Sequence, residues 1–233
     1  MKLAIMQPYF FPYIGYFQLV NAVDKFVIHD DVQWIKGGWI NRNRILMQGK
    51  PEHITLPLRK DSSLLQINQR NLAPDVEQEK QKILRRIESA YRSAPHFDQA
   101  FAIVSNCLDF KEENVSLLVI NSLRKCCEYL NISTPFVISS ELNKNNELSA
   151  EERVLDINKV MKAKHYINPI GGTELYDRET FSKHGLNLSY IKTGDISYKQ
   201  FNEDHVPFLS IIDVMMFNAP REINKMLDQY RLL

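Results

Sequence analysis

The stretch of sequence that decides the fold is LAIMQPYFFPYIGYFQLVNAVDKFVIHDD, residues 3–31. Its two short apolar runs, residues 3–6 and 26–28, have the length and the β-branched or aromatic content of buried strands. Three side chains between the runs fall on one helix face at the spacing i, i+4, i+7: Tyr13, Phe17 and Val20. The stretch therefore predicts a strand–helix–strand unit whose two strands both end in polar residues.

The rest of the chain adds strands and helices to this unit. Helical periodicity without an alternating strand pattern covers residues 74–131, which predicts three helices that form an insert or a lid. Further strands are predicted near residues 53–58, 136–138, 166–167 and 186–190, and two final helices near residues 209–217 and 220–230. Ser149 and Glu152 have the spacing of a capping box, and Gly185 has the place of a helix-terminating glycine.

This alternation predicts a single α/β domain over residues 1–233, with an open, mostly parallel sheet, flanking helices and the helical insert at about residues 74–131. A hydrophobic fraction of 44% and a charged fraction of 24% are typical of soluble globular proteins. The net charge of +1 provides no overall attraction to nucleic acid or to an anionic membrane. Because the apolar run before Gln7 is too short for a signal peptide, and no later run is long enough to cross a membrane, we expect a cytoplasmic protein without a membrane partner.

The three cysteines do not have the spacing of metal ligands, so no metal site is predicted from them. Cys107 stands alone, and Cys126 and Cys127 are adjacent on a predicted helix. We expect Cys126 to be a small buried hydrophobe. The alternative, a nucleophilic cysteine, has no histidine or aspartate near it in the sequence to support it.

The best candidate for chemistry is His29-Asp30-Asp31, which follows the second predicted strand. In an open parallel sheet, the carboxyl ends of the strands line a ligand crevice. A histidine there can act as a general base that a carboxylate orients, so we predict His29, Asp30 and Asp31 to be catalytic. Two alternatives remain. The acids could hold Mg²⁺ bound to a nucleotide or a sugar diphosphate, or they could cap a turn while His29 belongs to the core.

Substrate-binding residues are expected around this cluster. The loop after the first strand contains two prolines and four aromatic residues, which makes it a rigid wall. Asparagine and arginine side chains suit sugar hydroxyls, carboxylates or phosphates, a tryptophan can stack on a sugar ring, and paired glycines can expose N–H groups to an anion or serve turn geometry alone. The predicted binding residues are Gln7, Tyr9, Tyr16, Gln33, Trp39, Asn41, Arg42, Asn43, Gly171 and Gly172.

Five motifs occur in order along the chain: QPYFFPYIGYF (7–17), FVIHDDVQ (26–33), NRN (41–43), GGTELY (171–176) and LSIID (209–213). Together they resemble the WbqC-like family of bacteria over nearly the whole chain. The resemblance implies a place in O-antigen or other surface-polysaccharide biosynthesis and transfer of glycine or another aminoacyl group. It implies no roles for individual residues.

We therefore expect a transferase that attaches an acyl or aminoacyl group, glycyl included, to a sugar or nucleotide sugar. The donor stays open among acyl-CoA, a carrier-protein thioester, aminoacyl-tRNA and a free amino acid with ATP. Near-neutral charge disfavours extensive contact with tRNA, the one nucleic acid considered. The sequence identifies no cofactor. The alternatives are a nucleotidyltransferase-like enzyme or ATP-dependent ligase, and a non-catalytic ligand-binding or assembly protein.

Overall fold

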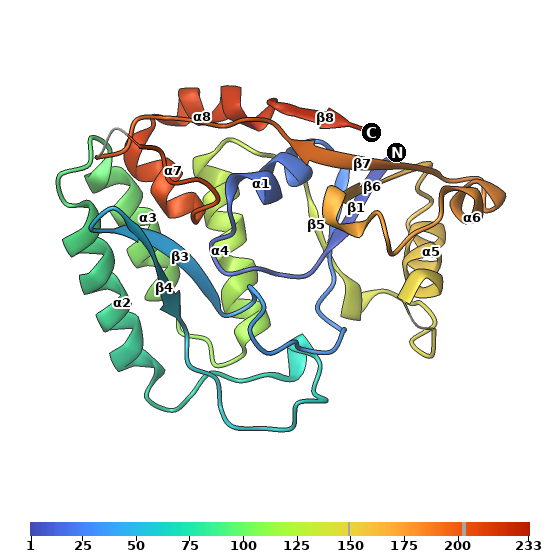
Figure 1. The fold of residues 1–233 in the computed structure, drawn as a ribbon. Coiled ribbons are helices and arrows are strands. Elements are labelled where there is room, and N and C mark those ends of the chain that lie inside the picture. The colour runs from blue at the N-terminus through green and yellow to red at the C-terminus, as the bar shows by residue number, and fades with distance from the viewer. Residues whose placement is uncertain (149, 202–203) are drawn as a thin grey trace.

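The computed structural model, which describes residues 1–148, 150–201 and 204–233, contains a six-stranded sheet in the order β5-β2-β1-β6-β7-β8 (Figure 1). The strands are β1 (Lys2–Met6), β2 (Lys25–Ile28), β5 (Phe136–Ile138), β6 (His165–Pro169), β7 (Asn187–Thr193) and β8 (Tyr230–Leu232). The five strands from β5 to β7 in the sheet order are parallel to one another, and β8 is antiparallel to β7. The predicted α/β class with a mostly parallel sheet is confirmed.

The strand order creates a topological switch between β1 and β6. From β1 the chain adds β2 and then β5 on one side of the sheet, and it later adds β6 and β7 on the other side. Parallel pairing joins Lys2 to His165 and Leu3 to Tyr166. The loop after β1 and the turn after β6 therefore lie at the same edge of the sheet, where α/β folds bind ligands.

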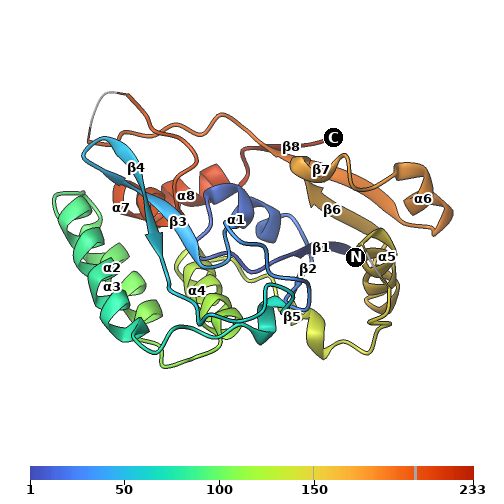
Figure 2. The ribbon, with the colours of Figure 1, turned by 60° about the horizontal axis from the view of Figure 1, so that its bottom comes forward.

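Successive side chains of the strands alternate between two hydrophobic clusters, one on each face of the sheet. Leu3 and Ile5 of β1 belong to one cluster, and Ala4 between them belongs to the other. Each face is covered by helices: α5 (Ala150–Val160) and α6 (Arg178–Lys183) on the first, and α1 (Ile14–Asn21), with α8 (Pro220–Leu227) packed against it, on the second. Figure 2 shows α5 and α6 apart from the other helices.

Three helices occupy the region predicted for the insert: α2 (Val76–Tyr91), α3 (Phe97–Leu108) and α4 (Val115–Tyr129). Their buried residues belong to the same cluster as Ala4, so they share a core with one face of the sheet. The assignment of a single domain with an insert or lid stays a prediction. All three cysteines are buried here, and burial raises the pKa of Cys107 and of Cys127 to about 12.

A two-stranded antiparallel sheet, β3 (Arg42–Met47) with β4 (Lys50–Thr55), lies outside the main sheet. The predicted strand at residues 53–58 is therefore wrong in its bounds, and β3 begins where a loop was expected. A tight turn connects the two strands, since Gln48 and Gly49 both have positive φ, of 50° and 76°.

The C-terminal part differs from prediction in one element. The helices α7 (Ile211–Phe217) and α8 are present, but the chain ends in β8 where the last helix was predicted to continue. Gly185 follows α6 with φ of 68°, which confirms its role at the helix end. Ser149 of the predicted capping box lies outside the described residues. No described helix combines the length and the apolar character needed to cross a membrane.

Candidate functional site

His29 and Asp31 meet at the carboxyl end of β2. The backbone N–H of His29 donates to the Met6 carbonyl at 2.8 Å, as in the sheet, whereas the N–H of Asp30 donates to the Ile28 carbonyl at 3.1 Å and closes a tight turn. The turn ends the strand, and the side chains two residues apart lie on the same side. His29 Nε2 is 3.8 Å from Asp31 Oδ1.

A buried lysine completes this pair. The Lys144 ammonium group forms an ion pair with Asp31 Oδ2, and its side chain is fully buried. It also donates to Asn146 Oδ1 at 2.8 Å. Arg153 of α5 donates from Nη1 to the Asp31 carbonyl at 3.1 Å, which fixes the backbone of the aspartate. Two cations, from the loop before α5 and from α5 itself, thus hold Asp31 in place.

These contacts set the charges of the pair in opposite ways. Burial lowers the pKa of His29 to about 4, although the Asp31 carboxylate acts in the other direction, so the imidazole is neutral near pH 7. For Asp31, burial raises the pKa, but the hydrogen bond and charge of Lys144 outweigh it and hold the pKa below its usual range. The site therefore contains a carboxylate, an ammonium and a neutral imidazole.

The two facing atoms of the pair have no hydrogen-bond partner among the described residues. His29 Nε2 and Asp31 Oδ1 are both buried, and at 3.8 Å they are too far apart to bond each other. The hydroxyl of Ser139, which directly follows β5, is also buried. It lies close enough to Asp31 to lower the pKa of the carboxyl group, but it is not within good hydrogen-bond geometry of any described residue. Buried polar atoms normally have hydrogen-bond partners. The absence of such partners here indicates a place where a ligand or water binds.

Asp30 faces a different element. Its carboxylate accepts hydrogen bonds from the N–H of Ser140 at 3.0 Å and from its hydroxyl at 2.7 Å. These bonds join the end of β2 to the short 3₁₀ helix η2 (Ser139–Glu141). Asp30 and Asp31 therefore do not form the joint Mg²⁺ site considered from the sequence, and no group of three histidine, cysteine or acidic side chains in the described residues could hold a metal.

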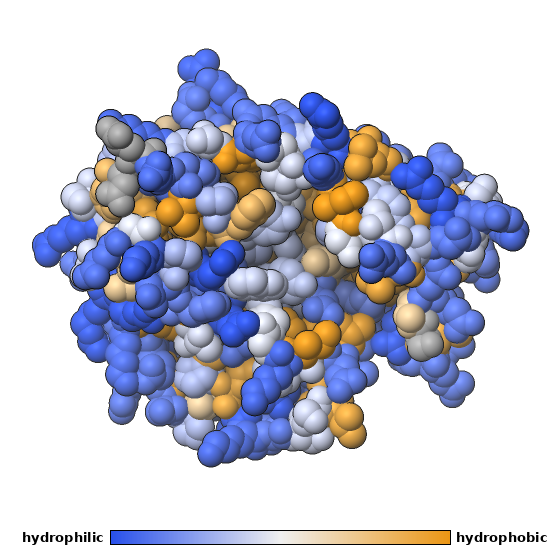
Figure 3. All heavy atoms as spheres, viewed as in Figure 1, coloured by the Kyte–Doolittle hydropathy of each residue, from blue (hydrophilic) through white to orange (hydrophobic). Residues whose placement is uncertain are grey.

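An aromatic pocket of about 320 Å³ lies after β1, and neither His29 nor Asp31 lines it. Its lining residues are Tyr9, Pro12, Tyr13, Trp39, Asn43, Arg44 and Phe208. Tyr9, Trp39 and Asn43 were predicted to bind substrate, and the structure brings them together here. The face of the molecule shown in Figure 3 is hollowed near its centre, between the helical block and α5 with α6.

Asn43 is a buried structural member of this aromatic pocket. Its amide nitrogen donates to the carbonyls of Phe10 and Phe11, both at 3.0 Å, and its oxygen accepts from the N–H of Arg44 at 2.8 Å. Phe11 has a φ of 40°, an unfavourable conformation for a bulky residue. Its carbonyl also accepts from the hydroxyl of Ser210 at 2.7 Å, so two buried side chains stabilise the strained loop.

Two arginines stack on the tryptophan of the pocket. The guanidinium carbons of Arg42 and Arg44 lie 5.8 Å and 5.5 Å from the ring centre of Trp39. Arg42 also donates to the carbonyls of Gly37 and Gly38, so it orders its own loop. Arg44 donates to the Phe208 carbonyl at 3.3 Å, while its Nε is buried without a partner in the described residues. Arg44 is thus the cation with hydrogen-bonding capacity left for a ligand.

Comparison with known sequences gives the family. A model of the WbqC-like protein family matches residues 7–225. This chain belongs to the WbqC-like protein family. A protein of Mycobacterium tuberculosis (strain ATCC 25618 / H37Rv), with the name "Uncharacterized protein Rv1507c", is 30% identical over 223 residues, which cover 95% of each chain. No solved structure matches.

Three of the predicted binding residues of this WbqC-like protein form hydrogen bonds within the fold. The Tyr16 hydroxyl donates to the Gln7 carbonyl at 3.0 Å and is buried, and Asn41 donates to the Leu56 carbonyl at 2.8 Å. Gln33 donates to the Ser63 carbonyl at 3.1 Å in an exposed loop. Gln7 is half-buried at the end of β1, where its backbone carbonyl has this structural role. Their predicted contact with substrate stays a prediction.

The two predicted glycines lie in the short 3₁₀ helix η3 (Ile170–Gly172), directly after β6. Gly171 is exposed, and a Cβ built on it would have no atom within 4 Å. A Cβ on Gly172 would come 1.8 Å from the amide nitrogen of Asn168, so any other residue here would have to displace that side chain. The turn stands opposite the loop after β1 at the topological switch, as the sheet register requires.

Sequence reasoning missed the residues of the site that are far from His29 and Asp31 along the chain. Lys144 and Arg153 contact Asp31 across 113 and 122 positions of the chain, a pairing that no local pattern indicates. Arg44 had a local signal, because it directly follows the predicted run of residues 41–43. Tyr13 was predicted on the core face of a helix. Instead it precedes α1, and its ring faces that of Phe208 at 6.3 Å.

Proposed function

We propose that this protein is a transferase that attaches an acyl or aminoacyl group to a sugar or nucleotide sugar during polysaccharide assembly. The observation that carries the proposal is the buried pair of His29 and Asp31, whose facing atoms are unpartnered in the described chain. The resemblance to the WbqC-like family supplies the reaction type, since it implies polysaccharide biosynthesis and glycyl transfer.

His29 is suited to accept a proton from an amine or hydroxyl group. Its neutral imidazole has a free lone pair, and Asp31, held ionised by Lys144, can stabilise the imidazolium that forms. In the proposed step, the acceptor nitrogen or oxygen attacks the carbonyl carbon of a thioester donor. A C–N or C–O bond forms, the C–S bond breaks, and the proton passes through His29 to the departing thiolate.

The aromatic pocket supports a sugar or nucleotide as the acceptor. Tyr9 provides a ring on which a sugar face or a base can stack. Trp39, whose own ring is stacked with His53 and lies beneath Arg44, positions Arg44 as a cation for a carboxylate or phosphate. Its volume of about 320 Å³ is at the small end of ligand sites. The pocket thus fits a monosaccharide unit or a base with one anionic group.

The test is a product assay with matched histidine variants. Purified protein is incubated with UDP-linked amino sugars and with acyl-CoA or glycyl donors, and mass spectrometry detects the acylated sugar. We expect the His29→Gln variant to lose a factor of about 10²–10⁴ in kcat, the usual contribution of a general base. His96→Gln, in the helical block, is the matched control and should retain full activity.

Three results would contradict the proposal. Full activity of His29→Gln would remove the general base. Pyrophosphate release that depends on ATP and Mg²⁺ would instead favour nucleotidyl transfer or ligation. Binding of a nucleotide sugar without turnover, with every donor class, would favour a non-catalytic binding protein.

A further inference from the structure

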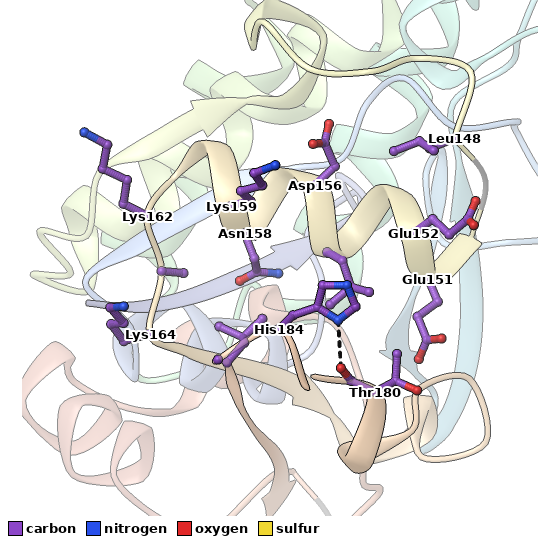
Figure 4. A pocket seen from close by; sticks show the side chains of 14 residues that line it. Leu148, Glu151, Glu152, Asp156, Asn158, Lys159, Lys162, Lys164, Thr180 and His184 are labelled. Carbon is purple, nitrogen blue, oxygen red and sulfur yellow. Dashed lines mark hydrogen bonds between the residues drawn. The ribbon is translucent and has the colours of Figure 1, made fainter. Parts of the chain in front are cut away.

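A second cavity, of about 740 Å³, lies between α5 and α6, and we call it the α5–α6 pocket. Lys164 and Leu186 in its wall directly precede β6 and β7, so it opens at the amino ends of these strands. The candidate site lies at the opposite, carboxyl ends. The volume is within the range of small-molecule sites, and Figure 4 shows the polar side chains that surround it.

Asn158 gives this pocket a buried acceptor. The residue is 2% exposed, and its amide nitrogen donates to the Val154 carbonyl at 2.8 Å, which fixes the orientation of the amide. Its Oδ1 is buried and has no partner among the described residues. A buried acceptor without a partner destabilises the fold. A ligand with a hydroxyl or N–H group would remove that destabilisation.

His184 gives the pocket a second acceptor. Its Nδ1 lies 2.8 Å from the Thr180 carbonyl, and because a carbonyl can only accept, Nδ1 carries the proton. When the ring carries this one proton, its lone pair is on Nε2. In Figure 4, the His184 ring lies between α5 and α6, and the dashed line marks its bond to Thr180. Two acceptors in one pocket favour a ligand with several donor groups.

The charges of the α5–α6 pocket are separated along α5. Lys159, Lys162 and Lys164 stand at the end of α5 and beyond it, at the left of Figure 4, and the acidic residues stand at the right. None of the three lysines forms an ion pair with a described residue. Among the acids, Glu151 and Asp156 already accept from backbone N–H groups. The lysine end is thus free to bind an anion.

We propose that the α5–α6 pocket binds a small phosphorylated polyol, such as a sugar phosphate. The phosphate binds at the lysine end of the pocket. Lys159, Lys162 and Lys164 point apart in Figure 4, but their exposed, flexible side chains can turn toward a bound phosphate. The hydroxyl groups donate to Asn158 Oδ1 and His184 Nε2, and the apolar face of the sugar packs on Leu155 and Leu186 of the wall. This proposal rests on the pocket alone and does not depend on the proposed transferase function.

The walls of this pocket connect it to the candidate site. Asp156 accepts from the N–H of Asn145 at 2.9 Å, and Asn145 directly follows the Lys144 that pairs with Asp31. Leu148 lines the pocket, and its carbonyl accepts from Nε of Arg153 at 2.9 Å. The segment of residues 144–148 therefore borders both sites. A bound ligand should slow hydrogen exchange in this segment.

The test is isothermal titration of the whole protein with glucose 1-phosphate, with glucose and inorganic phosphate as separate probes. We expect glucose 1-phosphate to bind more tightly than either part. Replacing two charge-assisted contacts in the double variant Lys162→Gln/Lys164→Gln should weaken this binding by at least about tenfold. Lys183→Gln on α6, outside the pocket, is the matched control and should bind as the wild type does. His184→Ala, at an exposed position, should reduce the preference for glucose 1-phosphate over inorganic phosphate.

Other results would overturn the proposal. If glucose 1-phosphate did not bind, or if the double variant bound it unchanged, the proposal would be wrong. The lysines would then serve only to complement the negative end of α5. Equal affinity for inorganic phosphate and glucose 1-phosphate would exclude recognition of the polyol. Because titration measures binding without turnover, none of these results depends on whether the protein transfers an acyl group.

Discussion

The carboxylate of Asp31 affects its two neighbours, Lys144 and His29, in different ways. Asp31 compensates the charge of an ammonium group whose side chain is completely buried, a charge that would otherwise cost several kcal/mol. The same carboxylate faces an imidazole that burial keeps neutral. Adding a proton to His29 therefore changes the balance of charge inside the protein, which makes the site sensitive to pH.

We expect the free energy of unfolding to fall as the pH decreases from 6.5 to 4, and part of this fall to come from His29. The folded-state pKa of His29 is lowered to about 4, so in this window the unfolded chain takes up a proton that the folded chain does not. The loss amounts to about 3 kcal/mol for this one side chain. Denaturant unfolding at several pH values measures it.

His29→Gln is the variant that isolates this effect. Burial also lowers the pKa values of His53 and His165, but these contribute equally to wild type and variant. The difference between the two stability curves should therefore be flat above pH 6.5 and should change between pH 6.5 and 4. A constant difference over this whole range would show that His29 titrates normally.

At the scale of elements, the hairpin of β3 and β4 positions Asn43 and Arg44 at the aromatic pocket. Its turn needs positive φ at both central residues, of which Gly49 is the second, at 76°. We expect Gly49→Ala to lower the free energy of unfolding by about 1 kcal/mol, because an L-residue with a side chain is strained in this conformation.

Gly171→Ala is the control for this glycine. Its φ is not positive, and the added Cβ meets no atom within 4 Å, so its effect on stability should stay within about 0.5 kcal/mol. Thermal or urea unfolding compares the two variants. If both lost the same stability, backbone strain at the turn could not be the cause.

The sequence predicted those elements that have a pattern of their own. The helices α2, α3 and α4 carry regular apolar faces, and β5 is a short apolar run, so their places followed from local spacing. The hairpin did not. Its first strand, Arg42–Met47, begins with the polar run Arg42-Asn43-Arg44, which suggested a binding loop, and its second strand contains Pro51. Likewise, Lys144 pairs with Asp31 through the tertiary fold, so only the structure could show that cluster.

At the scale of the whole molecule, a buried carboxylate links the helical block, the hairpin and the C-terminal region. Asp213 of α7 is fully buried and accepts from Tyr91 at 2.8 Å, Tyr198 at 2.6 Å and Gln200 at 2.7 Å. The Tyr91 hydroxyl in turn accepts from the N–H of Leu46 in β3 at 2.7 Å. The last residue of the LSIID motif therefore has a structural role.

We expect Asp213→Ala to cost about 3–5 kcal/mol of stability, because three buried donors lose their acceptor at once. Asp213→Asn keeps one oxygen and the shape of the side chain, so its loss should be smaller. Urea unfolding measures both, and hydrogen exchange at the Leu46 N–H should accelerate in the alanine variant. An alanine variant as stable as the wild type would show that the network adds nothing to stability.

The position of β1 at the centre of the sheet has a consequence for how the chain folds as it is synthesised. β1 and β2 are made early and can pair at once, but the register that joins Lys2 to His165 needs a partner that leaves the ribosome much later. Until then, the β6 side of β1 is an open strand edge of the kind that pairs with other chains. A ribosome stalled before β6 would therefore present an aggregation-prone nascent chain, and this is the stage at which a chaperone would be needed.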